Sequence, residues 1–349
     1  MAPKPGVIPL RPLDIGEILN AVFATIRYNF LAVYGLPLIT GVGCTVLFAV
    51  FGAIEWTPLH NFYLDAKANV DNYDWTPSGS EIANVVVAVV VLALLILVTY
   101  LATLISGTLS SIATLRHAVV GRRVGFRQIL SECTPYIWRL TGTTLLTQLL
   151  CGGPFLLSFG VVLALALVAN GSGAAALIAL LGFLLAAASF VWYLYSYIRL
   201  VPVNATVVLE GKRPVEAIRR AWRLNEGSWG RALGVTLLAA LIGGVIQYGV
   251  NQILSLFYLG ALGLSATPGT INTTDPANAK HVLLTELVII AAMVPVSLLT
   301  SLLTLPLTPL AQGLHYIDRR IRRESLDIQL AEEAGIPFHA PPPPATPAG

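Results

Sequence analysis

Charged side chains are scarce in this chain of 349 residues, of which only 11% are Asp, Glu, Lys or Arg. A soluble domain of ordinary composition has about 25% charged residues. Hydrophobic residues make up 56% of the chain, and the mean hydropathy is +0.75. The shortage of charge argues against a typical soluble domain and predicts a multi-pass membrane protein.

Residues that build disulfides, metal sites and catalytic centres are also few. The three cysteines show no C-x-x-C spacing, which favours buried free thiols over a disulfide or zinc site. The five histidines are scattered, and no G-x-S-x-G, H-E-x-x-H or phosphate-binding glycine loop occurs. We therefore expect no catalytic residues, no metal and no cofactor. These cysteines and histidines are Cys44, Cys133, Cys151, His60, His117, His281, His315 and His339.

Long uncharged runs separate the charged residues, and they predict membrane-spanning helices because about 20 apolar residues cross the hydrocarbon core. The run 140–198 is too long for one crossing and contains a turn sequence at Asn170–Gly173, so it counts as two spans. The six predicted spans lie near 29–53, 83–108, 142–168, 174–199, 232–258 and 287–312.

The distribution of lysine and arginine predicts the orientation of these spans. With both termini in the cytoplasm, the terminal segments and the loops around 116–139 and 200–231 hold all the basic residues except Lys67 and Lys280. Cytoplasmic loops are enriched in Lys and Arg, so this bias predicts a multi-pass protein of the plasma membrane with cytoplasmic N- and C-termini. The start of the chain mixes charges of both signs, so we expect the first span to be retained rather than cleaved as a signal.

Two external segments and the C-terminus complete the predicted topology. The segment 54–81 is acidic and aromatic; we interpret it as a solvated loop at the lipid–water boundary, and the alternative is a vestibule that attracts cations. The segment 259–282 has the composition of a plain connector. The proline-rich tail 334–349 is predicted to be a disordered cytoplasmic segment.

Three short amphipathic helices are predicted at the cytoplasmic face, one before each odd-numbered span. The first begins after Asp14, which forms a capping arrangement with Glu17. The second covers 126–133, and the third begins at Pro214, because proline favours the first turn of a helix. In each of them apolar residues recur at spacings of three and four, which places them on one face.

These helices and the spans that follow them fit three copies of one unit. The segments 110–123, 201–213 and 308–320 each end an even-numbered span with small and polar residues. The predicted fold class is therefore an all-α integral membrane protein with six transmembrane helices plus three cytoplasmic interfacial amphipathic helices. It forms a single membrane domain, 1–333, with possible repeat units 11–115, 116–203 and 204–318.

The clearest joint between units is the segment 204–224, in which a Gly-Lys-Arg turn leads into a basic amphipathic helix. A helix of this kind lies in the membrane interface, where each basic residue adds about 1 kcal/mol of attraction to an anionic leaflet. The candidate residues for binding lipid or a partner are therefore basic; the alternative is that they only enforce topology. They are Arg199, Lys212, Arg213, Arg219, Arg220 and Arg223.

Arg199 differs from the other candidates because no charge follows it until Glu210. A straight helix continuing past this residue would bury the arginine in the bilayer, where charge is costly and usually functional. Pro202 favours the alternative, in which the span ends near Arg199 and 203–209 packs under neighbouring helices.

Polar residues inside the fifth span are the remaining candidates. Gln247 and Asn251 stand four residues apart on one face, with Tyr248 beside them. Such residues either line a pathway or hydrogen-bond neighbouring helices. Gly243 and Gly244, in the same span, suit either a broken-helix site or close packing.

Three segments carry a resemblance to a known family. They are RPLDIGEILNAVFATIRYNF (11–30), VVLEGKRPVEAIRRAWRLNEGSWGRALG (207–234) and YIDRRIRRESLDIQLA (316–331). In these segments the chain resembles the actinobacterial glycerophosphoryl diester phosphodiesterase membrane domain family. The resemblance implies a six-span membrane domain; it does not imply phosphodiesterase activity, because the chain has no room for the catalytic barrel.

The sequence favours a non-enzymatic membrane component that binds or organises lipid or a partner protein at the cytoplasmic face. Expected partners are membrane lipids, including anionic ones, and either another membrane protein or a second copy of the chain; nucleic acid is not expected. The alternative is a transporter or permease that moves a small molecule or lipid through a polar site between the spans. A closed polar cavity near the bilayer midplane, with Gln247 and Asn251 facing it, would support this alternative.

Overall fold

The computed structural model describes residues 6–9, 11–68, 78–168, 175–265 and 300–333, and all regular structure in these ranges is helical. This confirms the predicted all-α class. The helices are α1 (Ile15–Tyr28), α2 (Phe30–Ala68), α3 (Gly79–Val119), α4 (Phe126–Cys133), the 3₁₀ helix η1 (Thr134–Tyr136), α5 (Ile137–Val168), α6 (Ala175–Arg199), α7 (Val203–Glu210), α8 (Pro214–Leu224), α9 (Trp229–Ser265), α11 (Leu307–Glu324) and α12 (Leu326–Glu333).

Five helices in the described ranges are long and apolar enough to cross a membrane. They contain the first five predicted spans, in α2, α3, α5, α6 and α9. The sixth predicted span, near 287–312, begins outside the described residues. Its described end is interrupted at Leu305 and Pro306 before α11 begins.

The prediction of an external loop over 54–81 is wrong for its first part, because α2 continues to Ala68. The fifth span is also extended, since α9 continues to Ser265. A helix satisfies its own backbone hydrogen bonds in water as well as in lipid, so the first charged residue marks the membrane boundary and not the helix end. The Pro-rich tail 334–349 and most of the connector 259–282 lie outside the described residues.

The three predicted amphipathic helices are present as α1, α4 and α8. The capping box at α1 is formed, with the backbone N–H of Asp14 donating to the Glu17 carboxylate at 2.9 Å. Pro214 occupies the first turn of α8. Helices α1 and α4 bury apolar residues such as Ile18 and Ile129. Helix α8 buries Ala217, Ala221 and Leu224, and it leaves Val215 on its outer side 59% exposed.

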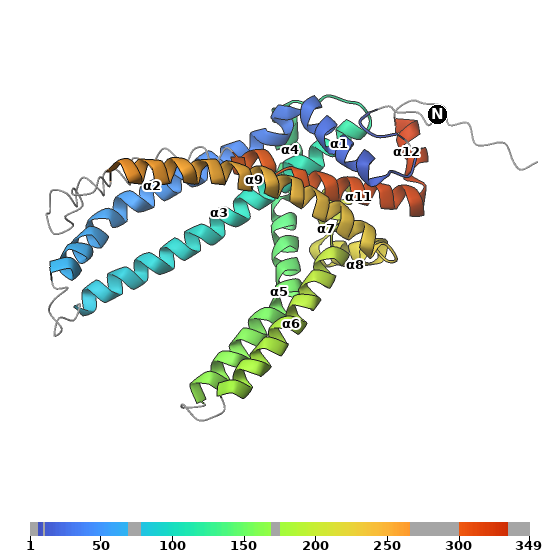
Figure 1. The fold of residues 1–349 in the computed structure, drawn as a ribbon. Coiled ribbons are helices and arrows are strands. Elements are labelled where there is room, and N and C mark those ends of the chain that lie inside the picture. The colour runs from blue at the N-terminus through green and yellow to red at the C-terminus, as the bar shows by residue number, and fades with distance from the viewer. Residues whose placement is uncertain (1–5, 10, 69–77, 169–174, 266–299, 334–349) are drawn as a thin grey trace, which may run out of the picture.

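The long helices form two arms that diverge from a common base (Figure 1). Helices α2 and α3 pack together as the first arm, and α5 and α6 pack together as the second. The arms join at a base formed by residues 11–28, 105–140, 196–236 and 307–333, which we call the basic end. Helix α9 leaves the basic end and packs against α11 and α6.

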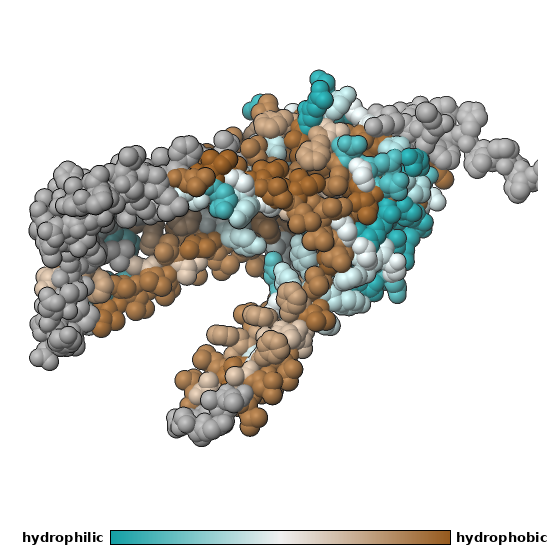
Figure 2. All heavy atoms as spheres, viewed as in Figure 1, coloured by the Kyte–Doolittle hydropathy of each residue, from teal (hydrophilic) through white to brown (hydrophobic). Residues whose placement is uncertain are grey.

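The surface of the molecule changes character between these parts (Figure 2). The described parts of the arms are covered with hydrophobic side chains, whereas hydrophilic ones gather over α8, α11 and α12. The arm residues Leu157 and Phe183 are 73% and 71% exposed. Soluble monomers rarely expose large apolar patches, so this surface, on helices long enough to cross a bilayer, indicates a membrane protein.

The core of the basic end is built where three segments meet. The C-terminal part of α3, the short helix α7 and helix α11 pack against one another. Gly313 allows close approach, since a Cβ atom there would lie 2.8 Å from Leu115. These are the three segments that the sequence marks as small and polar at the end of a span.

The chain turns sharply between α6 and α8. Helix α6 ends at Arg199, Pro202 precedes α7, and α7 is buried through Val207 and Val208. Gly211 ends α7 in the left-handed conformation, with φ of 68°, which glycine adopts without strain. This is the arrangement that Pro202 predicts, and it places Arg199 at the basic end rather than within an arm.

Candidate functional site

The six basic candidates around the joint lie in three different environments. Arg220 is paired inside the protein: its Nη2 lies 3.2 Å from Glu210 Oε1 and 2.5 Å from Glu324 Oε1. Burial alone would lower the pKa of Arg220, but the hydrogen bonds to both carboxylates outweigh it and raise that pKa. Glu216 stands four residues before Arg220, a spacing that favours an ion pair within the helix; in the structure the partners of Arg220 lie on α7 and α11 instead.

The ion pairs of Arg220 belong to a network that links three helices. Tyr316 donates a hydrogen bond of 2.5 Å to Glu210, and Arg320 donates one of 2.8 Å to Glu324. Burial and the contact with Glu210 raise the pKa of Tyr316, so its hydroxyl stays protonated. Arg220 thus holds α8 against α7 and α11, and it is not available to a ligand.

Two arginines from the preceding joint hold the end of α7. Arg116 donates to the carbonyl of Leu209 at 3.0 Å, and Arg139 donates to the carbonyl of Gly211 at 3.0 Å. The last carbonyls of a helix lack partners within the helix, and cations there also favour the helix dipole. These arginines, which the sequence assigns to topology, therefore have a structural role as well.

Arg199 contacts an aromatic cluster. Its guanidinium lies 5.0 Å from the ring centre of Trp222, and the Trp222 ring meets Tyr195 edge to face. Asn225 donates to the carbonyls of Ile198 and Arg199, which fixes the end of α6. The cation–π contact holds α6 against α8.

Arg219 and Arg223 are exposed on the outer face of α8, and neither forms an ion pair with a described residue. They border a groove of about 340 Å³ between α8 and the second arm. Trp192 donates to the carbonyl of Leu150 at 3.0 Å and so fixes one wall of this groove. We call it the α8 groove, and its lining residues are Leu150, Trp192, Val215, Ile218, Arg219, Trp222 and Arg223.

Lys212 and Arg213 are also exposed, in the turn that precedes α8. They do not line the α8 groove. Of the six basic candidates, the structure therefore brings Arg219 and Arg223 together over an apolar surface, and Arg199 contacts Trp222, which lines the same groove. Lys212 and Arg213 add positive charge nearby.

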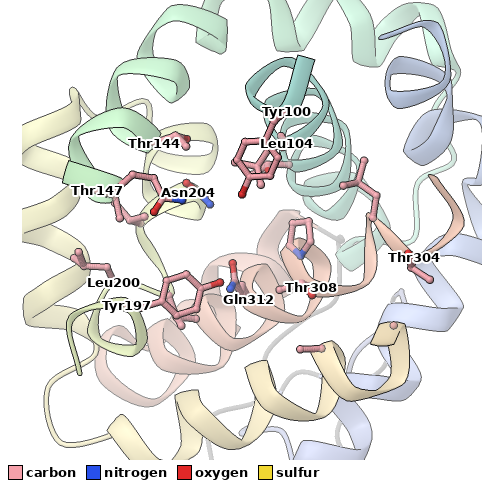
Figure 3. A pocket seen from close by; sticks show the side chains of 18 of the residues that line it. Tyr100, Leu104, Thr144, Thr147, Tyr197, Leu200, Asn204, Thr304, Thr308 and Gln312 are labelled. Carbon is pink, nitrogen blue, oxygen red and sulfur yellow. The ribbon is translucent and has the colours of Figure 1, made fainter. Parts of the chain in front are cut away.

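A second hollow, of about 680 Å³, lies where the arms meet (Figure 3). Figure 3 shows Asn204, Tyr197, Gln312 and Thr147 around it, contributed by α7, α6, α11 and α5. We call it the junction cavity. Its lining residues are Tyr100, Leu104, Thr108, Thr144, Thr147, Gln148, Tyr193, Tyr197, Leu200, Val201, Val203, Asn204, Ala240, Gly243, Gly244, Gln247, Ser301, Thr304, Leu305, Thr308, Pro309 and Gln312.

The polar candidates of α9 differ in whether they line this cavity. Gln247 lines it and donates a long hydrogen bond, 3.4 Å, to Asn251. Asn251 and Tyr248 lie outside the lining, and Tyr248 is 66% exposed. Gly243 and Gly244 also line the cavity, where their lack of a side chain widens it.

Several cavity residues give only a weak signal in the sequence. Gln148, Asn204 and Gln312 are isolated polar residues in uncharged segments. An isolated amide in such a segment needs a partner, and this is the signal that could have identified them. They come from three helices, so the sequence alone does not show that they meet.

A buried ionic centre fixes the basic end beside these sites. Asp318 is fully buried; it lies 3.1 Å from Arg231 and 3.0 Å from Arg322, and it accepts the backbone N–H of Leu13 at 2.9 Å. Arg231 also donates to the carbonyl of Leu13. The N-terminal segment, α9 and α11 are joined at this point.

Groups of three or more His, Cys, Asp or Glu side chains placed to hold a metal ion do not occur in the part of the chain that the structure describes. Cys133 and Cys151 are buried free thiols, and Cys44 is a partly exposed one. No family model, curated protein or solved structure matches this chain. The resemblance to the phosphodiesterase membrane domain family therefore stays a prediction, and the α8 groove and the junction cavity are the features of the described structure that bear on function.

Proposed function

We propose that this protein is a non-enzymatic membrane component that binds anionic lipid at its cytoplasmic face. The observation that carries the proposal is the α8 groove, in which two arginines without ion-pair partners among the described residues border an apolar floor. An anionic phospholipid has the matching chemistry, because its phosphate accepts hydrogen bonds from guanidinium groups while its acyl chain covers apolar side chains.

The place of the groove in the molecule supports this proposal. It lies between α8 and the second arm, at the border of the hydrophobic surface and the hydrophilic basic end. The basic end is the cytoplasmic end if the positive-inside bias sets the orientation. The groove then faces the headgroup layer of the cytoplasmic leaflet, where anionic lipids give a negative surface potential.

The test is lipid retention by the purified protein, measured by native mass spectrometry after equilibration with mixed phosphatidylglycerol and phosphatidylcholine. We expect the double variant Arg219→Gln/Arg223→Gln to lower the affinity for phosphatidylglycerol at least about tenfold, since each basic residue contributes about 1 kcal/mol. Arg220 is left unchanged because its ion pairs hold the fold.

The matched control is Arg122→Gln/Arg127→Gln, which removes two exposed arginines of another joint. Both double variants lose two positive charges from the basic end. A lipid site requires that only the α8 variant lose affinity. Equal losses would mean that the arginines act only as diffuse charge, and an unchanged affinity in the α8 variant would refute the site.

A transporter or permease is the alternative from the sequence, and Gln247 supports it by lining the junction cavity. Asn251 lies outside the lining, and the described parts of the arms beyond the cavity carry exposed apolar side chains. These features favour a binding site at the junction of the arms over a polar pathway along them. Binding therefore stays the leading proposal.

A further inference from the structure

The junction cavity differs in chemistry from the α8 groove. Among the described residues, its lining contains tyrosine, threonine, glutamine and asparagine side chains and no charged one. Its volume of about 680 Å³ lies within the range of small-molecule sites, about 300–1,000 Å³. A ligand with a net charge would leave that charge without a partner in a site of low dielectric, which is costly.

The cavity is reached from between the arms. Tyr100, on the first arm, is 54% exposed, and Gln148, on the second, is also exposed; both line the cavity. The described surfaces of the arms on either side are hydrophobic (Figure 2). A molecule that enters here therefore passes between walls suited to acyl chains before it meets the polar lining.

The polar groups of the lining differ in their partners. The hydroxyl of Thr147 is buried and has no hydrogen-bond partner among the described residues. The amide of Asn204 points into the same space, whereas the hydroxyl of Tyr197 lies beside Gln312 and forms a hydrogen bond with it (Figure 3). Buried polar groups without partners are uncommon in proteins because each costs about 1–3 kcal/mol, so the Thr147 hydroxyl indicates a ligand or water that hydrogen-bonds it.

We propose that the junction cavity binds a membrane lipid with an uncharged, hydroxyl-bearing headgroup, whose acyl chains lie between the two arms. The hydroxyls donate to and accept from the amide and hydroxyl side chains, and the tyrosines Tyr193 and Tyr197 supply flat surfaces for the headgroup. This inference does not depend on the α8 groove, because the two sites share no lining residue.

The experiment uses the full chain in lipid nanodiscs that contain a monoglucosyl diacylglycerol with a diazirine in one acyl chain. After photolysis, mass spectrometry locates the labelled peptides. We expect labelling of the facing walls of α3 and α5, near Tyr100 and Gln148. The double variant Asn204→Leu/Gln247→Leu should lower this labelling about tenfold, since two hydrogen-bonding amides are lost.

The matched control is Gln252→Leu, the same substitution on α9 at a position outside the lining. It should leave the labelling unchanged. Circular dichroism and thermal unfolding that match those of the unmodified protein show that the double variant is folded, whatever the outcome at the α8 groove. A double variant that is folded and still labelled as strongly as the unmodified protein would refute the proposal.

Two further measurements identify the ligand class. Free methyl glucoside carries the same hydroxyls without chains, and we expect it not to compete at concentrations equal to the lipid; equal competition would refute a lipid ligand in favour of a soluble sugar. A diazirine-tailed phosphatidylglycerol should label the cavity peptides at most one tenth as strongly. Equal labelling by both lipids would refute selection for an uncharged headgroup.

Discussion

The basic end and the arms hold their structure by opposite means. In the basic end, polar groups are buried with partners: Asp318 accepts the backbone N–H of Leu13, and Tyr316 donates to Glu210. In the arms, leucine and phenylalanine side chains are exposed over most of the helix surface. The comparison indicates that the basic end is stabilised from within, whereas the arms depend on lipid, which satisfies apolar surface as a protein core would.

The largest effect should come from breaking the ionic centre of the basic end. Asp318→Asn removes the charge that Arg231 and Arg322 face. Removing one member of a buried ion pair costs about 3–5 kcal/mol, and the lower end applies here because Arg231 and Arg322 are 25% and 34% exposed. We expect the variant to lose about 3 kcal/mol of unfolding free energy in SDS titrations of mixed micelles.

The control for this prediction is Glu226→Gln. Glu226 is exposed in the turn after α8, and only its backbone carbonyl accepts hydrogen bonds from Arg319 and Arg323. Its neutralisation should change the unfolding free energy by less than about 0.5 kcal/mol. Similar losses in the two variants would mean that net charge, and not the buried centre, stabilises the basic end.

Features set by local pattern were predictable from the sequence. Five described spans follow from uncharged runs, and α1, α4 and α8 follow from apolar spacing and from Asp14 and Pro214. These signals lie within one helix, where period and capping decide the outcome. The end of α2 was not predictable in this way, because the first charged residue indicates where the chain leaves the membrane, and the helix continues beyond that residue.

Features made by distant segments could not be predicted. Arg220 has Glu216 at helical spacing, yet it pairs with Glu210 and with Glu324, more than 100 positions along the chain. The junction cavity likewise gathers single polar residues from several helices, and of the polar candidates only Gln247 lines it. The residue that pairs with Arg220 depends on how the helices pack against one another. The spacing of residues within one helix does not indicate that packing.

A second prediction uses pH to weaken the basic end alone. His315 is fully buried on α11, and burial lowers its pKa from 6.5 to about 4. Asn225 donates its amide N–H to Ile198, so its oxygen accepts from His315 Nε2 at 3.2 Å. His315 Nδ1 is buried without a partner among the described residues, so a proton added there would have no acceptor.

The direction in which pH changes the unfolding free energy follows from these pKa values. Between pH 6.5 and about 4 the unfolded chain binds a proton that folded His315 does not, so stability falls as the pH is lowered. From pH 7 to 5 we expect a loss of about 2 kcal/mol. His315→Gln should remove most of this dependence in the same SDS titrations, and a variant that keeps the full pH slope would assign the slope to other groups.

The smallest expected change in stability is that of a substitution on the surface of an arm. Leu156, on the second arm, is 68% exposed, whereas Leu314 of the basic end is fully buried. As the buried comparison, Leu314→Ala should cost at least about 2 kcal/mol because it leaves a cavity. Leu156→Ala should cost less than about 0.5 kcal/mol in lipid, because this side chain contacts lipid both in the folded protein and in the unfolded state within the membrane. A large loss at Leu156, measured in nanodiscs by thermal unfolding, would mean that another protein surface and not lipid covers this arm.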